Sequence, residues 1–221
     1  MMRATVDELV RDNEPARAGR DGGGSIRRGD GRLRLLNNGS PPPGSTAIWV
    51  GISAIIMMFA AFTSALVVRE GAALDWRHIE IPRILFLNTI VLLASSTTLE
   101  MFRRAFANRQ RAATNVPGVD SFWLYVTFGL GLLFLAGQYT AWVQLNREGL
   151  YLASNPSSSF FYVLTGAHGL HVLGGLWGLF YVLKKSRRGS LRAGTLDIAA
   201  KYWHFMDILW LYLLGLLWIK L

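Results

Sequence analysis

Five apolar stretches, each long enough to cross a lipid bilayer, dominate the hydrophobic pattern of this chain. They cover about 46–68, 84–102, 122–145, 159–183 and 202–219, and short polar connections separate them. A transmembrane helix needs about 20 mainly apolar residues at a rise of 1.5 Å each. The pattern therefore predicts an all-α polytopic membrane protein, a bundle of five transmembrane helices spanning residues 46–221.

Residues 1–45 differ sharply in composition from the rest of the chain. They are rich in Gly, Arg and Asp, include GRDGGGS (19–25), and end in PPPGS (41–45). They hold too little apolar surface to offset the entropy of ordering the chain. No apolar core with a cleavage site precedes the first span, and scattered acidic residues argue against a mitochondrial presequence. We expect a disordered, basic cytoplasmic tail.

The positive charge is unevenly distributed among the polar segments. Of the 23 Lys and Arg residues, 18 lie in the N-terminal segment and in the second and fourth connections. The positive-inside rule then places the N-terminus in the cytoplasm and the C-terminus outside. The net charge of +9 comes with no nucleic-acid-binding motif, so we expect no nucleic-acid partner. The absence of cysteine excludes thiolate metal sites and disulfides.

Histidines occur inside two of the apolar stretches, FFYVLTGAHGLHVLGG (160–175) and KYWHFMDILWLYL (201–213). His168 and His171 share a helical face, roughly 22 and 18 Å above the cytosolic end, whereas His204 is expected only about 3–5 Å inside that end. Metal ligands must lie near 2 Å from one ion. We therefore expect structural histidines and no metal or cofactor bound by this chain. The alternative is an independent haem- or metal-binding membrane protein.

Two further polar residues fall at the same depth as His168. Asn88 in the second span and Gln138 in the third lie about 22–26 Å above the cytosolic end. Hydrogen bonds between transmembrane helices contribute about 0.6 kcal/mol on average. We predict an interhelical polar belt of Asn88, Gln138 and His168, which His171 could extend.

A second polar group is expected near the cytosolic rim. Glu100 lies near the inner end of the second span, while Trp203, His204 and Asp207 share one face of the fifth. Glu100 has Lys201, His204, Arg103 and Arg104 as potential partners. The pattern favours an ion-pair network that anchors helix ends over a proton-collecting carboxylate surface.

Small residues in the fourth span indicate close helix packing. Gly174 and Gly178 form a GxxxG pair, which permits close approach of a helix from this chain or from another subunit.

Taken together, these motifs resemble the haem–copper oxidase subunit III family, that is, cytochrome c oxidase subunit 3. The runs FFYVLTGAHGLHVLGG and KYWHFMDILWLYL are similar to its last two helices, and LNTIVLLASSTTLE (87–100) to an earlier signature helix. Gln138 stands where the family has a glutamine. The five-span length resembles the short bacterial form, which lacks the first two helices of the seven-helix version.

The resemblance implies a non-catalytic subunit of a proton-translocating respiratory complex in the bacterial cell (inner) membrane. Haem and copper would belong to partner subunits I and II, with subunit I as the main contact. The expected roles are stabilising subunit I, binding phospholipid and supporting proton uptake during O2 reduction to water. The family's signature positions are His168, His171, Trp203, His204 and Asp207, with inferred roles in packing, hydrogen bonding and lipid contact.

Two departures from the family pattern limit this inference. Ala54 and Ala141 stand where the family often carries carboxylates, so no mechanism that needs those two carboxylates transfers to this chain. Glu100 is a possible substitute. A quinol oxidase subunit III and an accessory protein of nitric oxide reductase remain alternatives, because the electron donor is chosen by subunit II.

Overall fold

Five long helices make up most of the computed structural model, which describes residues 27–29, 32–34, 43–72, 82–112, 121–152 and 155–220. The helices are α1 (Pro43–Ala72), α2 (Ile84–Ala112), α3 (Ser121–Arg147), α4 (Pro156–Arg187) and α5 (Ala193–Lys220). Each is long and apolar enough to cross a membrane. The prediction of an all-α, five-span protein is therefore confirmed, while the side on which each terminus lies stays a prediction.

The N-terminal segment forms a unit of its own, Met1–Pro41. Within it, β1 (Arg27–Gly29) and β2 (Arg32–Arg34) pair as antiparallel strands, with Arg28 opposite Leu33. The rest of the tail lies outside the described residues, so its expected disorder stays a prediction.

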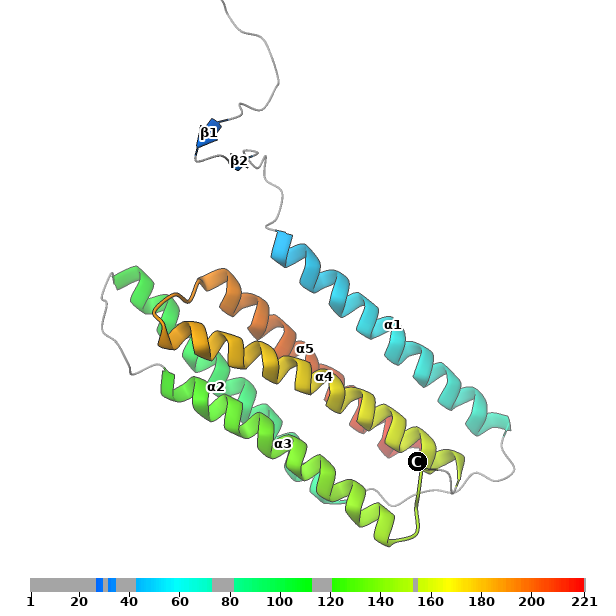
Figure 1. Ribbon diagram of the computed structural model, residues 1–221. Helices are drawn as coiled ribbons and strands as arrows, with labels where there is room; N and C mark the ends of the chain where they lie inside the picture. Colours follow the sequence, from blue (N-terminus) through cyan, green and yellow to red (C-terminus); the bar gives the residue numbers. More distant parts are fainter. Residues whose placement is uncertain are drawn as a thin grey trace, which may run out of the picture. The chain divides into compact units, whose positions relative to one another are not determined.

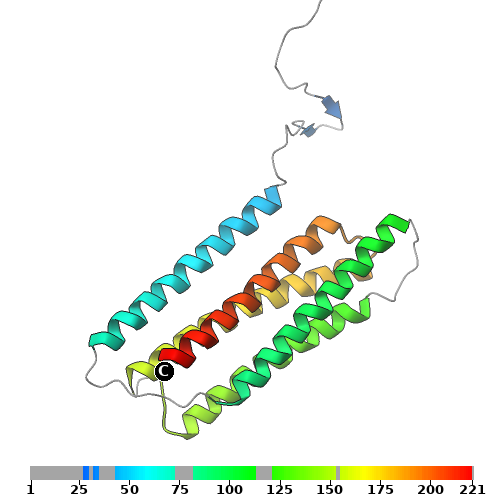
Figure 2. The ribbon, with the colours of Figure 1, turned by 180° about the vertical axis from the view of Figure 1, so that it is seen from behind.

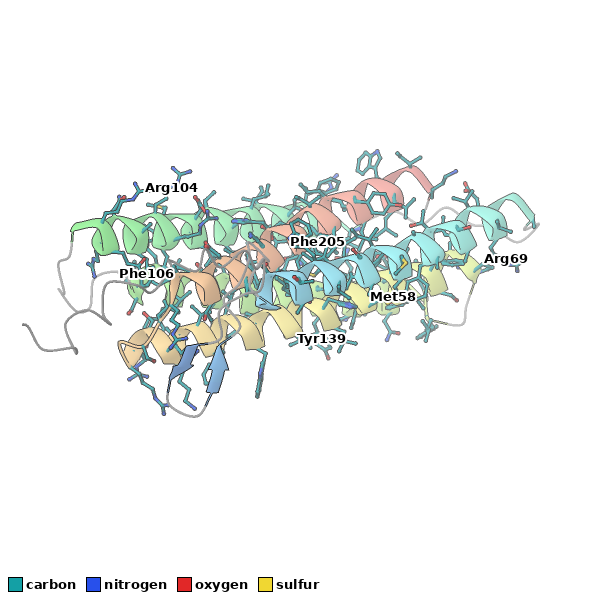
Figure 3. All side chains as sticks on the ribbon, turned by 90° about the horizontal axis from the view of Figure 1, so that it is seen from above. Met58, Arg69, Arg104, Phe106, Tyr139 and Phe205 are labelled. Carbon is teal, nitrogen blue, oxygen red and sulfur yellow. The ribbon has the colours of Figure 1, made fainter. Side chains whose placement is uncertain are left out.

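In the helical unit, α4 and α5 lie between α1 on one side and α2 with α3 on the other (Figures 1 and 2). Short connections make consecutive helices run antiparallel, as in other helix bundles. Basic residues gather where α2 and α4 end and where α3 and α5 begin, which we call the basic end of the bundle. Arg104 of α2 lies toward this end and Arg69 of α1 toward the other (Figure 3).

The helices extend beyond the apolar spans that the sequence delimits. The fifth helix begins at Ala193, not near residue 202. The sequence pattern missed its first turns because they are polar and do not stand out in hydropathy. At the start of α4, the Asn155 side chain accepts a hydrogen bond of 2.8 Å from the Ser158 backbone N–H, which caps the helix. Gly189, at φ 63°, supplies the left-handed residue that follows its end.

Trp203 of α5 lies at the centre of the packing and is 1% exposed. Its indole Nε1 donates a hydrogen bond of 3.0 Å to Ser95 Oγ on α2. A Cβ atom added to Gly131 of α3 would come within 2.9 Å of this ring, and one added to Gly175 of α4 within 3.1 Å. One side chain of α5 therefore contacts three other helices, and two glycines provide the space for its ring.

The GxxxG pair is not the close contact within this chain. A Cβ on Gly178 would meet nothing within 4 Å in the part of the protein that the structure describes, and one on Gly174 would reach Tyr202 Oη at 3.7 Å. The adjacent Gly175 makes the tight contact, because one residue along a helix turns the side chain by about 100°. The Gly178 surface remains open to lipid or to another subunit.

We predict that Gly175→Ala destabilises the protein by about 1–3 kcal/mol, the usual cost of overpacking a core. The Trp203 ring is rigid and buried, so it cannot move away from the new methyl group without losing its other contacts. Thermal unfolding of the purified protein in detergent measures the effect. Gly178→Ala is the matched control on the same helix, and equal losses for both variants would contradict the prediction.

A second glycine prediction concerns the contact between α2 and α3. A Cβ on Gly137 would overlap the Asn88 side chain, whose Nδ2 donates a hydrogen bond of 3.3 Å to Phe134 O. We expect Gly137→Ala to displace Asn88, break this bond and lower thermal stability. Gly129→Ala should leave stability unchanged or raise it slightly, because that position is open and Ala favours helix. A Gly137→Ala protein as stable as Gly129→Ala would argue against this packing.

Candidate functional site

The residues of the predicted polar belt lie near one turn of α3, but they do not all bond to one another. Asn88 links α2 to α3 through its bond to Phe134 O. His168 packs on the Phe134 ring with centroids 5.9 Å apart, and Gln138 follows one turn later on α3. The Gln138 amide and both His168 ring nitrogens are buried and make no direct hydrogen bond to any described residue. Of the three residues in the predicted polar belt, only Asn88 makes a direct hydrogen bond between helices.

His168 and His171 point toward different helices. The His168 ring lies between Phe134 of α3 and Trp210 of α5, 5.1 Å from the latter. The His171 ring packs on Phe59 of α1, 5.9 Å away, and its Nδ1 donates to Ala167 O at 2.7 Å. Within residues 43–220, as far as they are described, no three His, Asp or Glu side chains gather into a metal-binding group. The geometry suits packing more than ligation.

His204 lies deeper along its helix than the sequence suggested. Because α5 begins at Ala193, His204 is about 16 Å from the first residue of the helix at 1.5 Å per residue. Tyr202 Oη donates to His171 O at 3.0 Å, so the second signature run is level with the end of the first. The expectation that His204 opens the fifth helix was wrong, because the start of the apolar run is not the start of the helix. The depth of His204 in a membrane stays a prediction.

Glu100 is the centre of an ion-pair network on α2 and α5. Its carboxylate accepts from Arg104 Nε at 2.9 Å and lies 3.3 Å from Arg103 Nη1. Arg103 also reaches Asp197 of α5, with 3.3 Å between Nε and Oδ1. His204 Nε2 is 4.0 Å from Glu100 Oε2. These partly exposed pairs connect the two helices toward the basic end, and each contributes only modestly to stability.

Asp207 is a buried carboxylate one turn beyond His204. It is 4% exposed, and its Oδ2 lies 4.0 Å from His204 Nδ1. Neither carboxylate oxygen has a hydrogen-bond partner among the residues described. Ser96 of α2 is hydrogen-bonded to His204 Nδ1, and its hydroxyl group also lies beside the Asp207 carboxylate.

Several hydroxyl groups of α2 belong to this site, although the sequence analysis did not single them out. Ser95 accepts from Trp203, Ser96 bonds to His204, and Thr89 accepts from Trp210 Nε1 at 3.0 Å. The signal that could have revealed them is the SSTT run (95–98) inside an otherwise apolar helix. Residues of α2 and α5 thus form a polar seam, which consists of Thr89, Ser95, Ser96, Glu100, Arg103, Trp203, His204, Asp207 and Trp210.

A surface hollow of about 300 Å³ lies elsewhere, near the end of α3 and the start of α4. Aromatic side chains line most of it, and Asn146 supplies an amide; the lining residues are Tyr139, Trp142, Val143, Asn146, Tyr151, Leu152 and Tyr162. Aromatic side chains at helix ends are typical of the membrane interface, where lipid headgroups lie. The hollow is therefore suited to contact with lipid.

Comparison with known proteins places these features in a family. The family model described as cytochrome c oxidase subunit III matches residues 49–220. This range includes helices α2 to α5 completely, most of α1 and the whole polar seam.

Individual relatives agree with that match. A probable cytochrome c oxidase subunit 3 of Nocardia farcinica is 34% identical over 191 residues, which cover 81% of this chain and 88% of that protein. One from Mycobacterium bovis is 32% identical over 82% of this chain and 89% of its own length. A cytochrome c oxidase subunit 3 of Synechocystis is 36% identical over 57% of this chain and 52% of its own length. The chain is thus a multi-pass membrane protein that belongs to the cytochrome c oxidase subunit III family, whose members form part of an oxidoreductase complex.

Proposed function

We propose that this chain is the non-catalytic subunit III of a haem–copper terminal oxidase, cytochrome c oxidase, in the bacterial cell (inner) membrane. It stabilises subunit I and supports proton uptake while the complex reduces O2 to water in aerobic respiration. Haem and copper are carried by subunits I and II, and subunit I is the main contact. The observation that carries the proposal is the family match over residues 49–220.

The packing of the signature side chains between helices supports a stabilising role. Trp203 and His168 are fully enclosed by neighbouring helices, and His171 packs on α1. These contacts hold the bundle in one arrangement, and a rigid bundle can hold a neighbouring subunit in place. None of these side chains has to touch a reacting molecule for this role.

Contact with subunit I and with lipid is supported by the outer surface. Among the described helices, α1 packs only on α4 and α5, and it keeps large apolar side chains exposed, among them Trp49, Met57 and Val68. Such a surface requires lipid or another transmembrane subunit around it. Bound phospholipid would have the aromatic hollow near Trp142 and Tyr162 as one contact.

Support for proton uptake rests on the polar seam, which extends from the basic end into the bundle. In the orientation that the positive-inside rule predicts, this end faces the cytoplasm, the side from which a respiratory oxidase takes up protons. Glu100, His204 and Asp207 lie on this path in that order.

We predict that an oxidase complex lacking this chain keeps most of its initial rate but inactivates after fewer turnovers. The reason is that subunit I keeps its haem and copper but loses a rigid neighbour. Oxygen consumption with reduced cytochrome c, followed until activity stops, measures both quantities. Trp203→Phe in the intact complex should also shorten the time before inactivation, but by less, because it removes the hydrogen bond to Ser95 while keeping an aromatic ring. Immediate, complete loss of O2 reduction in an otherwise assembled complex would refute a supporting role.

Another prediction concerns the metal content of the complex. Complexes carrying His168→Asn or His171→Asn should retain the haem and copper stoichiometry of the wild type, because these rings serve helix packing. Haem spectra and elemental analysis of the purified complexes provide the measurement. Trp210→Phe, which alters the same packing region without removing any imidazole, is the control. Loss of one metal or haem per complex in a histidine variant alone would favour a metal-binding protein instead.

A further inference from the structure

Asp207 is an unusual residue for the interior of a membrane-spanning bundle. Its side chain is 6% exposed, and both carboxylate oxygens lack a hydrogen-bond partner among the described residues. An ionised carboxylate buried without partners is strongly unfavourable, and such a group in a membrane commonly marks a proton or ion pathway. The burial and the missing partners together indicate a group that binds a cation, the simplest being a proton.

The His204 ring lies between this buried carboxylate and the partly exposed Glu100. Its Nδ1 is 4.0 Å from Asp207 Oδ2, and its Nε2 is 4.0 Å from Glu100 Oε2. Ser96 Oγ is hydrogen-bonded to Nδ1 and adjoins Asp207. The two nitrogens of one imidazole thus face the two carboxylates, which is the arrangement that a proton relay requires.

Glu100 and Asp207 differ in their surroundings. Glu100 is held by Arg103 and Arg104, which favour its ionised form and fix its position. Asp207 has no arginine or lysine paired with it among the described residues. Of the two carboxylates on the seam, Asp207 is the one free to gain and lose a proton, and Glu100 is the one suited to draw cations toward His204.

We propose that Asp207 is a proton-exchanging carboxyl group inside the bundle, and that His204, with Ser96, connects it to the Glu100 end of the seam. A proton adds to Nε2 of a His204 ring that carries its hydrogen on Nδ1. The Nδ1 hydrogen passes to the Ser96 hydroxyl oxygen while the Ser96 hydroxyl hydrogen passes to the Asp207 carboxylate, and the ring is again neutral. The carboxylate becomes a neutral carboxylic acid. No electrons move, and the reverse transfer returns the proton.

The other titratable and charged groups around the seam come from three helices. Glu100 and Arg103 face it from α2, while Asp197 and Lys201 precede His204 on α5. The α4 residues His168 and His171 pack on other rings. The part of α1 level with this site, residues 50–62, contains no charged residue.

This inference deepens the proposed role in proton uptake and rests on it for its physiological meaning. The proton exchange at Asp207 can be tested without turnover of the oxidase. A failure of this proposal therefore does not imply a failure of the proposed function, and the reverse is also true. The measurement is the infrared C=O band of protonated carboxyl groups in the purified, resting oxidase complex, recorded in H2O and after transfer to D2O. We expect Asp207→Asn to remove one such band.

The relay is tested by a second variant. His204→Phe keeps a ring but removes both nitrogens, so the Asp207 band should remain while its exchange in D2O slows by about a hundredfold, at the lower end of what a positioned proton-transfer group contributes. Asp197→Asn is the matched control, because it removes an exposed carboxylate from the same helix near the same end. It should change neither the band nor its exchange.

Clear outcomes would overturn the proposal. If Asp207→Asn removes no band, Asp207 is ionised or holds a metal cation such as Na⁺, and it is not a proton-binding group. If His204→Phe leaves the exchange rate unchanged, the route does not pass through His204. If the Asp207→Asn variant fails to assemble, Asp207→Glu provides the same test, because it keeps a carboxyl group. The C=O band should then shift. An unshifted spectrum would contradict the assignment of the band to Asp207.

Discussion

The contact of Trp203 with its neighbours is the constraint on which the arrangement of the bundle depends. The indole from α5 bonds to Ser95 of α2 and fits against Gly131 of α3 and Gly175 of α4. Inside a membrane, apolar side chains gain little by leaving lipid for protein, so close packing and hydrogen bonds must hold helices together. A large, rigid ring in a space provided by two glycines supplies both and fixes the rotation of four helices at once.

Polar groups in this bundle follow two different patterns. Along α2 and α5, hydroxyl groups of Thr89, Ser95 and Ser96 satisfy tryptophan and histidine side chains, which ties the helices together pair by pair. His168 and Asp207 instead lie buried without direct hydrogen bonds to the described residues. Such burial is costly, and a fold retains it only where other contacts hold the backbone in place. The packing around Trp203 and Trp210 provides those contacts.

These two patterns of polar groups agree with the supporting role that we propose for this subunit. The family match and the five membrane-crossing helices give the chain its place in an oxidase complex. Glu100, His204 and Asp207 lie next to one another on the polar seam, which begins at the basic end. This arrangement suits the supporting role that we propose for the chain.

The sequence by itself determined the five spans, the fold class and the family, because segment length, hydrophobicity and motifs are all visible in the linear sequence. It also identified Glu100, His204 and Asp207 as neighbours, since they occur at helical spacing or at matched ends of spans. Only the tertiary structure decided that Gly175 and not Gly178 makes the close contact, that α5 begins at Ala193, and that Ser96 joins His204. Those features depend on the rotation and axial register of each helix. Packing against other helices sets both, and an all-round apolar helix carries no periodic signal that would reveal them.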